Sequence, residues 1–225
     1  MEVKNQAAVW LDELGAISDE PPQLTRTFLS PALGRAKELV AGWMRVASLE
    51  VYEDQAGNLI GRLDCGNPTA GTVIGGSHLD TVRNAGKFDG PLGVVAGILA
   101  VAEIRRRGMP LPHHLEIVGF SDAEGVRFQT TYLGSRHYTG NLGSVELAAK
   151  DASGIAVSEA IAKHRPAFAP PPPIRNPLGY VEAHIEQRPV LETANLALGV
   201  VTAIAGQTRA RIFWQAKPGM PEPRR

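Results

Sequence analysis

A histidine and two acidic residues lie close together in the segment Gly75 to Asp89, which reads GGSHLDTVRNAGKFD. His78 and Asp80 are two residues apart, so on an extended backbone their side chains lie on the same face. An imidazole and a carboxylate together suit zinc or a substitute such as manganese, and Asp80 can fix the tautomer of a metal-bound His78. The structural alternative is that His78 completes a strand end and Asp80 caps a turn. This pair alone does not decide between the two interpretations.

The apolar pattern around this segment predicts the elements that must position it. Thr72 to Leu79 reads as a buried strand, Leu92 to Arg107 as a helix and Leu115 to Phe120 as a second strand. Two strands around one helix form a βαβ unit, in which functional groups gather at the carboxyl ends of the strands. His78 and Glu124 both come at such ends. We therefore expect an α/β fold with both residues at one edge of its sheet.

The remaining elements are predicted less sharply. We expect two helices in the first fifty residues, the second beginning at Pro31 after Ser30, and a hairpin at residues 55–58. Further expected elements are small helical pieces at 145–149 and 158–163, an extended proline run at 170–173 and a strand pair over Leu196 to Phe213.

Composition excludes several classes of function. Lys plus Arg and Asp plus Glu both total 23, so the chain has no net positive charge that would attract nucleic acid or an acidic membrane surface. Cys65 is the only cysteine, which rules out an internal disulfide and a cysteine-based zinc cage. The N-terminus carries acidic residues where a secretory signal is basic, and no window is apolar enough to span a bilayer. We expect a cytoplasmic protein that binds a small molecule.

Four separate segments each offer one candidate metal ligand: His78, Asp89, Glu124 and His184. Each has a structural alternative, because Asp89 could start a turn, Glu124 could cap one and His184 could be a core histidine. The combination of HLD, FDG, a carboxylate after a strand and HIEQ is improbable as a set of unrelated residues. It predicts one metal site.

The blocks that carry these residues resemble a known family. They read GGSHLDTVRNAGKFDGPLGVVAG, GFSDAEGVRFQTTYLGSR, YVEAHIEQRPVLE and VTAIAGQTR. They resemble the dinuclear zinc amidohydrolases that include N-carbamoyl-L-amino-acid hydrolase and allantoate amidohydrolase, relatives of the zinc aminoacylases and aminopeptidases. The resemblance extends to about Arg211.

This resemblance implies a three-layer, metallopeptidase-like catalytic domain with a mostly parallel central sheet. We expect an incomplete catalytic domain at 1–205, the start of a lid or dimerisation domain at 206–213 and an aberrant tail at 214–225, with the C-terminal part and the lid missing. The homodimer of the family is then doubtful for this chain, because the pairing surface belongs to the lid.

The resemblance also assigns roles to single residues. Two zinc ions, or manganese, would be held by His78 and His184 on the first ion, Asp89 between the ions and Glu124 on the second ion, with Asp80 orienting His78. Gln187 and Gln207 stand where the family contacts substrate, although a surface or strand-pairing role is an equal alternative for either.

Ala123 departs from the family pattern, because it stands where the family has the glutamate that acts as general base. Losing such a group costs roughly 10²–10⁴-fold in rate. The function implied is hydrolysis of a linear non-peptide C–N bond, in an N-carbamoyl amino acid, allantoate or another ureido acid, by metal-activated water, with this chain inactive or impaired. The alternatives are a dipeptidase or deacylase of the same clan and a non-catalytic metal-binding remnant.

Overall fold

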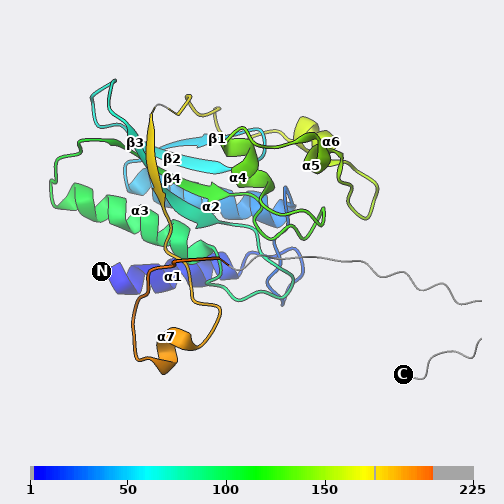
Figure 1. Ribbon diagram of the computed structural model, residues 1–225, viewed down its shortest axis with the longest axis horizontal. Helices are drawn as coiled ribbons and strands as arrows, with labels where there is room; N and C mark the ends of the chain where they lie inside the picture. Colours follow the sequence, from blue (N-terminus) through cyan, green and yellow to red (C-terminus); the bar gives the residue numbers. More distant parts are fainter. Residues whose placement is uncertain (1–2, 175, 205–225) are drawn as a thin grey trace, which may run out of the picture. The chain divides into compact units, whose positions relative to one another are not determined.

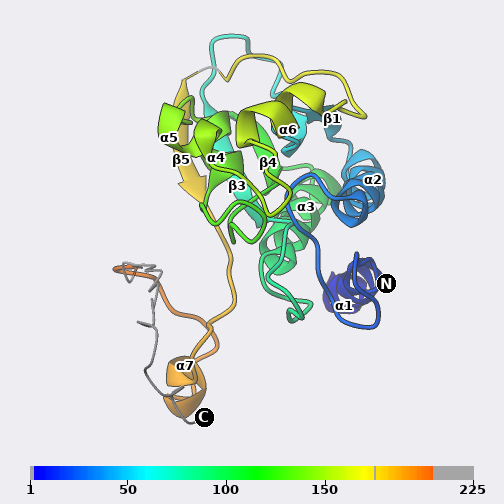
Figure 2. The same cartoon turned by 90° about the vertical axis from the view of Figure 1, so that its right-hand side faces the viewer.

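The computed structural model describes residues 3–174 and 176–204. The chain divides into two compact units, Met1–Ile185 and Glu186–Arg225. The first unit contains a five-stranded sheet covered by helices (Figures 1 and 2). The described part of the second unit contains the short helix α7, Val190–Thr193, whose first amides donate to the carboxylate of Glu186.

The sheet has the strand order β1-β2-β4-β3-β5. Its strands are β1 Glu50–Glu53, β2 Leu59–Leu63, β3 Thr72–His78, β4 His114–Phe120 and β5 Pro177–Val181. β3 pairs in parallel with both β4 and β5, whereas β2 is antiparallel to β1 and to β4. All strands except β2 therefore run in one direction, so this mixed sheet agrees with the expected α/β class and its mostly parallel sheet.

Helices cover both faces of the sheet. On one face lie α1 Val3–Gly15, α2 Pro31–Val46 and α3 Pro91–Arg106, and on the other lie α4 Leu133–Tyr138, α5 Ser144–Ala148 and α6 Val157–Lys163 (Figure 2). The main apolar core lies between the first group and the sheet, where Ile98 and Ile117 are buried together. A smaller core on the second face contains Ile74, Val118 and the partly buried Tyr138. The expected three layers are present.

Local signals explain the start of α2 and the packing of α3. The hydroxyl of Ser30 accepts a hydrogen bond from the amide of Leu33 at 3.2 Å, and Pro31 follows as the first helical residue. α3 packs very closely on the sheet at Gly93, where an added Cβ would come within 2.7 Å of the Ser77 Cβ and 2.4 Å of the Ala183 carbonyl oxygen. This close approach fixes α3 against the strand that ends at His78.

The predicted strand pair over Leu196 to Phe213 is wrong in its first part. Residues 196–204 form no helix or strand, and apolar side chains there, such as Leu198 and Val200, are exposed. An apolar pattern cannot form a strand without a partner edge to supply hydrogen bonds. The predicted divisions at 206–213 and 214–225 lie outside the described residues. Among the residues described, no helix is long and apolar enough to cross a membrane.

Candidate metal centre

Three of the four predicted ligands converge at the carboxyl edge of the sheet. His78 is the last residue of β3, Asp89 lies in the loop before α3, and His184 follows β5. One ligand atom from each lies within 4.8 Å of the others. His184 Nε2 is 3.3 Å from Asp89 Oδ1, and the two imidazole rings have centroids 5.8 Å apart. Side chains far apart in sequence thus form one group able to hold a divalent cation.

The fourth predicted ligand faces the same group. Glu124 Oε1 lies 3.9 Å from Nε2 of His78, on the loop that follows β4. This is the edge predicted from the βαβ pattern, because β3 and β4 are parallel neighbours that pair His78 with Phe120. Two imidazoles and two carboxylates therefore meet at the ends of adjacent strands.

Asp80 connects the two loops that carry these ligands. Its backbone carbonyl lies 2.8 Å from Nδ1 of His78, and its Oδ1 lies 3.5 Å from the same nitrogen. The two carboxylate oxygens accept hydrogen bonds from the backbone amides of Ala123 at 2.9 Å and Glu124 at 3.0 Å. Asp80 thus leaves Nε2 of His78 facing the ligand group and at the same time holds the loop of Glu124.

Gly90 allows the loop before α3 to pass directly beside His78. Its φ is +85°, and an added Cβ would come within 2.5 Å of both Cε1 and Nδ1 of the His78 ring. No side chain fits between this backbone and the imidazole. The glycine of the FDG motif therefore lets the loop of Asp89 pack against the first histidine.

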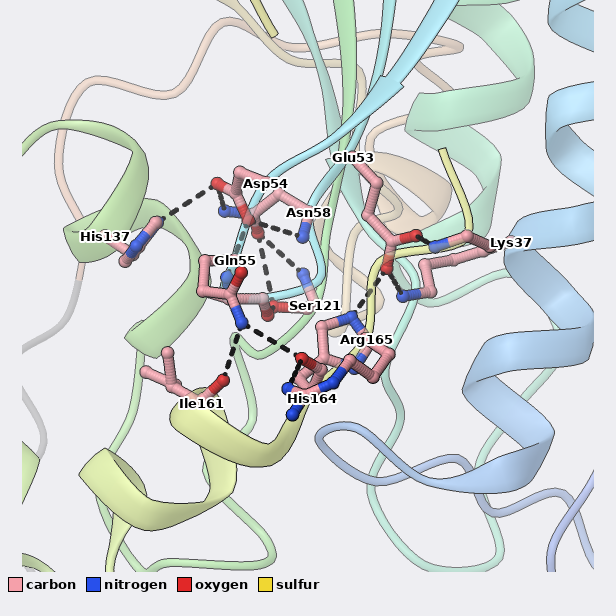
Figure 3. A network of polar contacts seen from close by, with 12 residues as sticks. Lys37, Glu53, Asp54, Gln55, Asn58, Ser121, His137, Ile161, His164 and Arg165 are labelled. Atoms are coloured by element: carbon pink, nitrogen blue, oxygen red, sulfur yellow. Dashed lines mark hydrogen bonds and ion pairs between the residues drawn. The ribbon is translucent and has the colours of Figure 1, made fainter. Parts of the chain in front are cut away.

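A buried polar network holds the start of the loop after β4 (Figure 3). The side-chain oxygen of Asn58 accepts from the amide of Ser121 at 3.0 Å, and its nitrogen donates to Asp54 at 2.6 Å and to the Gly134 carbonyl at 2.9 Å. Asp54 also lies 3.1 Å from Nδ1 of His137 on α4. The β1–β2 hairpin thereby braces the loop that presents Glu124.

Arg26 is a supporting residue that the sequence reasoning missed. It is fully buried, its Nε donates to the Leu79 carbonyl at 3.0 Å, and its backbone exchanges hydrogen bonds with Thr81. Burial lowers its pKa to about 10, against the opposing charges of Asp80 and Asp19. Nothing in the segment LTRTF separates this arginine from a surface one, so only the fold reveals its place beside the loop of His78.

Electrostatics at the centre show a surplus of negative charge. Burial lowers the pKa of His78, but its hydrogen bonds to Asp80 and the charges of Asp80 and Glu124 prevail and raise that pKa to about 9. Burial also raises the pKa of Glu124, as do the charges of Asp80 and Asp89. The carboxylates thus stabilise a positive charge at this position, and a divalent cation bound by neutral imidazoles supplies one. The donor set therefore fits a metal ion.

The other predicted site residues have different outcomes. Ala123 lies beside Glu124, with its amide bonded to Asp80, and its methyl group cannot take up a proton. Asp122, the neighbour of Ala123 and not itself a predicted site residue, accepts a hydrogen bond from the amide of Leu133 at 3.3 Å, which ties it to the start of α4. Gln187 belongs to the second unit, so its substrate contact stays a prediction. Gln207 lies outside the described residues.

Comparisons with known proteins bear on this site. No family model matches the chain. It is 41% identical to allantoate deiminase of Arabidopsis thaliana, over 96% of this chain and 43% of that protein. It is 46% identical to N-carbamoyl-L-amino acid amidohydrolase of Geobacillus stearothermophilus, over 87% of this chain and 49% of that protein. A solved hydantoinase/carbamoylase family amidase from Burkholderia ambifaria is 34% identical, with a TM-score of 0.73 over 87% of this chain and 50% of that chain.

The chain is thus similar to the allantoate deiminase and carbamoylase family of amidohydrolases. The expected resemblance is confirmed for both family names. The chain spans about half the length of the curated relatives that it matches. His78, Asp89, Glu124 and His184 all lie in the first unit, so the ligand group of this chain is formed by residues of that unit.

Proposed function

We propose that this chain forms the metal-binding part of an amidohydrolase that cleaves a linear non-peptide C–N bond. The substrate class is an N-carbamoyl amino acid or a ureido acid such as allantoate. The observation that carries the proposal is the convergence of ligand atoms from His78, Asp89 and His184 within 4.8 Å. The names of the relatives, allantoate deiminase and N-carbamoyl-L-amino acid amidohydrolase, support the substrate class.

Each residue of the centre has a proposed role. His78 and His184 would hold the first metal ion, Glu124 would hold the second, and Asp89 would serve both. Zinc suits this set of imidazole and carboxylate ligands, and manganese is the natural substitute. Such ions, when bound, polarise a substrate carbonyl and lower the pKa of water. Asp80 orients His78 through Nδ1 and keeps Nε2 directed at the ligand group.

Ala123 sets the proposed limit on rate. A general base positioned to take a proton from water raises the reaction rate roughly 10²–10⁴-fold, and a methyl group gives no such increase. Ala123→Glu restores a carboxylate beside Glu124, on a loop that Asp80 holds through backbone amides. We expect Ala123→Glu to raise turnover by a factor within that range.

The experiment measures ammonia release from N-carbamoyl-L-amino acids and from allantoate, with zinc or manganese added to metal-free protein. Slow, metal-dependent turnover that rises in Ala123→Glu and is lost in Ala123→Glu/His184→Ala supports the proposal. N-acyl amino acids and dipeptides, whose hydrolysis yields no ammonia, are assayed in parallel by release of the free amino acid, and preference for them would identify a deacylase or dipeptidase of the same clan instead.

A second candidate function is metal binding without catalysis, which the missing base at Ala123 favours. It predicts that zinc binds with an affinity that depends on His184, as titration calorimetry can measure. It also predicts that neither the natural chain nor Ala123→Glu turns over any of these substrates. That pair of results would reject the enzymatic proposal.

A further inference from the structure

A second group of metal-type donors lies at the other end of β4 from the candidate metal centre. Asp64 and Cys65 come directly after β2, and His114 is the first residue of β4. The antiparallel register pairs Leu63 with Leu115, so the next residues along, Asp64 and His114, face each other across the two strands. The fold therefore brings a carboxylate, a thiol and an imidazole together at this corner.

The three donors are close enough to share one ion. One ligand atom from each lies within 4.8 Å of the others, and Asp64 Oδ1 is 3.3 Å from Nδ1 of His114. The His114 side chain is only 2% exposed, whereas that of Asp64 is 60% exposed. A cavity of about 290 Å³ adjoins the group and is lined by Asp64, Cys65, Arg105, Gly108, Met109 and Leu111. The group thus has a fixed, buried ligand and an accessible side.

The backbone amide of Cys65 selects the tautomer of His114. The amide of Cys65 donates to Nδ1 of His114 at 3.3 Å, which makes Nδ1 the nitrogen that carries the lone pair. The same nitrogen faces a carboxylate oxygen of Asp64 at 3.3 Å. Asp64 Oδ1 also accepts from the amide of Gly66 at 2.7 Å, so the turn after β2 presents both acceptors at this corner, and a bound ion would replace the long amide contact at Nδ1. Cys65 places a thiol sulfur beside this contact. A metal ion binds such a sulfur in its thiolate form.

We propose that Asp64, Cys65 and His114 bind one divalent metal ion of the zinc type. Thiolate, imidazole and carboxylate are all zinc ligands, and three protein ligands leave the fourth tetrahedral position open. The thiolate and carboxylate charges balance the ion when the imidazole is neutral. The guanidinium of Arg105, which lines the same cavity, favours water or a small anion as the fourth ligand. The site shares no residue with the candidate metal centre.

Cobalt titration of the full, reduced chain tests this site separately from the other. Cys65 is the only cysteine, so a thiolate-to-cobalt charge-transfer band in the near ultraviolet can arise only here. We expect this band to reach the intensity of one thiolate-bound cobalt ion per chain, whatever further cobalt the candidate metal centre takes up, and to be displaced by zinc. It should vanish in Cys65→Ser, and it should persist in His184→Ala, which removes a ligand from the candidate metal centre.

A variant of the exposed Asp64 decides whether these three residues bind a metal ion. Asp64→Asn alters an exposed side chain and leaves the core intact, and we expect it to weaken cobalt binding about tenfold or more. Glu159→Gln, on the exposed side of α6, is the matched control for loss of one acidic charge and should leave the affinity unchanged. Two results would overturn the proposal: no thiolate band in folded protein, or a band with the same affinity in Asp64→Asn. Either would reduce this corner to an ion pair between His114 and Asp64 beside an unrelated thiol.

Discussion

Replacing Gly90 by alanine tests how the loop before α3 positions the first histidine. Gly90 has φ +85° and ψ −61°, and an added Cβ would lie 2.5 Å from two atoms of the His78 ring and 2.6 Å from its carbonyl oxygen. A left-handed backbone costs an L-residue about 1–2 kcal/mol, and overpacking of a filled site adds about 1–3 kcal/mol. We therefore expect Gly90→Ala to lower the free energy of unfolding by roughly 2–5 kcal/mol.

The same substitution should also weaken metal binding. His78 cannot move away freely, because its Nδ1 is held 2.8 Å from the Asp80 carbonyl, so the added methyl group must displace either the ring or the loop of Asp89. Urea unfolding measures the stability, and zinc titration calorimetry on the folded variant measures the affinity. Gly86→Ala is the matched control in the same loop, where an added Cβ meets nothing within 4 Å. If the two variants unfold within about 0.5 kcal/mol of each other and bind zinc equally, the steric argument is refuted.

Two further predictions concern the polar network of Figure 3. Glu53 is buried against Lys37, with its Oε1 2.8 Å from Nε2 of His164, so Glu53→Gln leaves a buried ammonium without its countercharge and should cost about 3–5 kcal/mol in urea unfolding. Burial raises the Glu53 pKa, but the bonds to His164 and Lys37 prevail and lower it below 4.5. The stability that Glu53 contributes is therefore present above pH 4.5 and is lost on further acidification. In Glu53→Gln the free energy of unfolding should accordingly fall less steeply with acidification. His137 behaves oppositely, because its hydrogen bond with Asp54 raises its pKa above 6.5: its contribution is complete below pH 6.5 and is lost as the pH rises through the raised value. Unfolding curves of His137→Gln should lack that alkaline loss, and an unchanged pH profile would contradict this account.

The sequence predicts the βαβ unit and the start of α2 because each carries a local signal. Apolar runs mark β3 and β4, and Ser30 with Pro31 marks a helix start that needs no tertiary information. The ligands His78 and Glu124 then follow from topology, because the carboxyl ends of parallel strands meet at one edge. The local pattern and the topology thus predict the edge of the sheet at which the candidate metal centre lies.

The rest depends on contacts that leave no local trace. β5 begins at a proline and its residues are exposed, so this edge strand carries no apolar alternation. Arg26 looks like a surface residue in sequence but is buried against the backbone of Leu79. Pairing of Asp64 with His114 follows only from the register of β2 and β4. Long-range register and burial therefore set the limit of what the sequence predicts.

The hydrogen bonds of Asp80 have a consequence for which substitutions this fold can accept. Asp80 recognises the loop after β4 through main-chain amides, so the shape of that loop does not depend on the side chain at position 123. Mutational drift at position 123 can therefore remove or restore a proton acceptor while the neighbouring ligand Glu124 stays in place. Asp80 has no such freedom, because any replacement disturbs a histidine and a glutamate on two different loops at once.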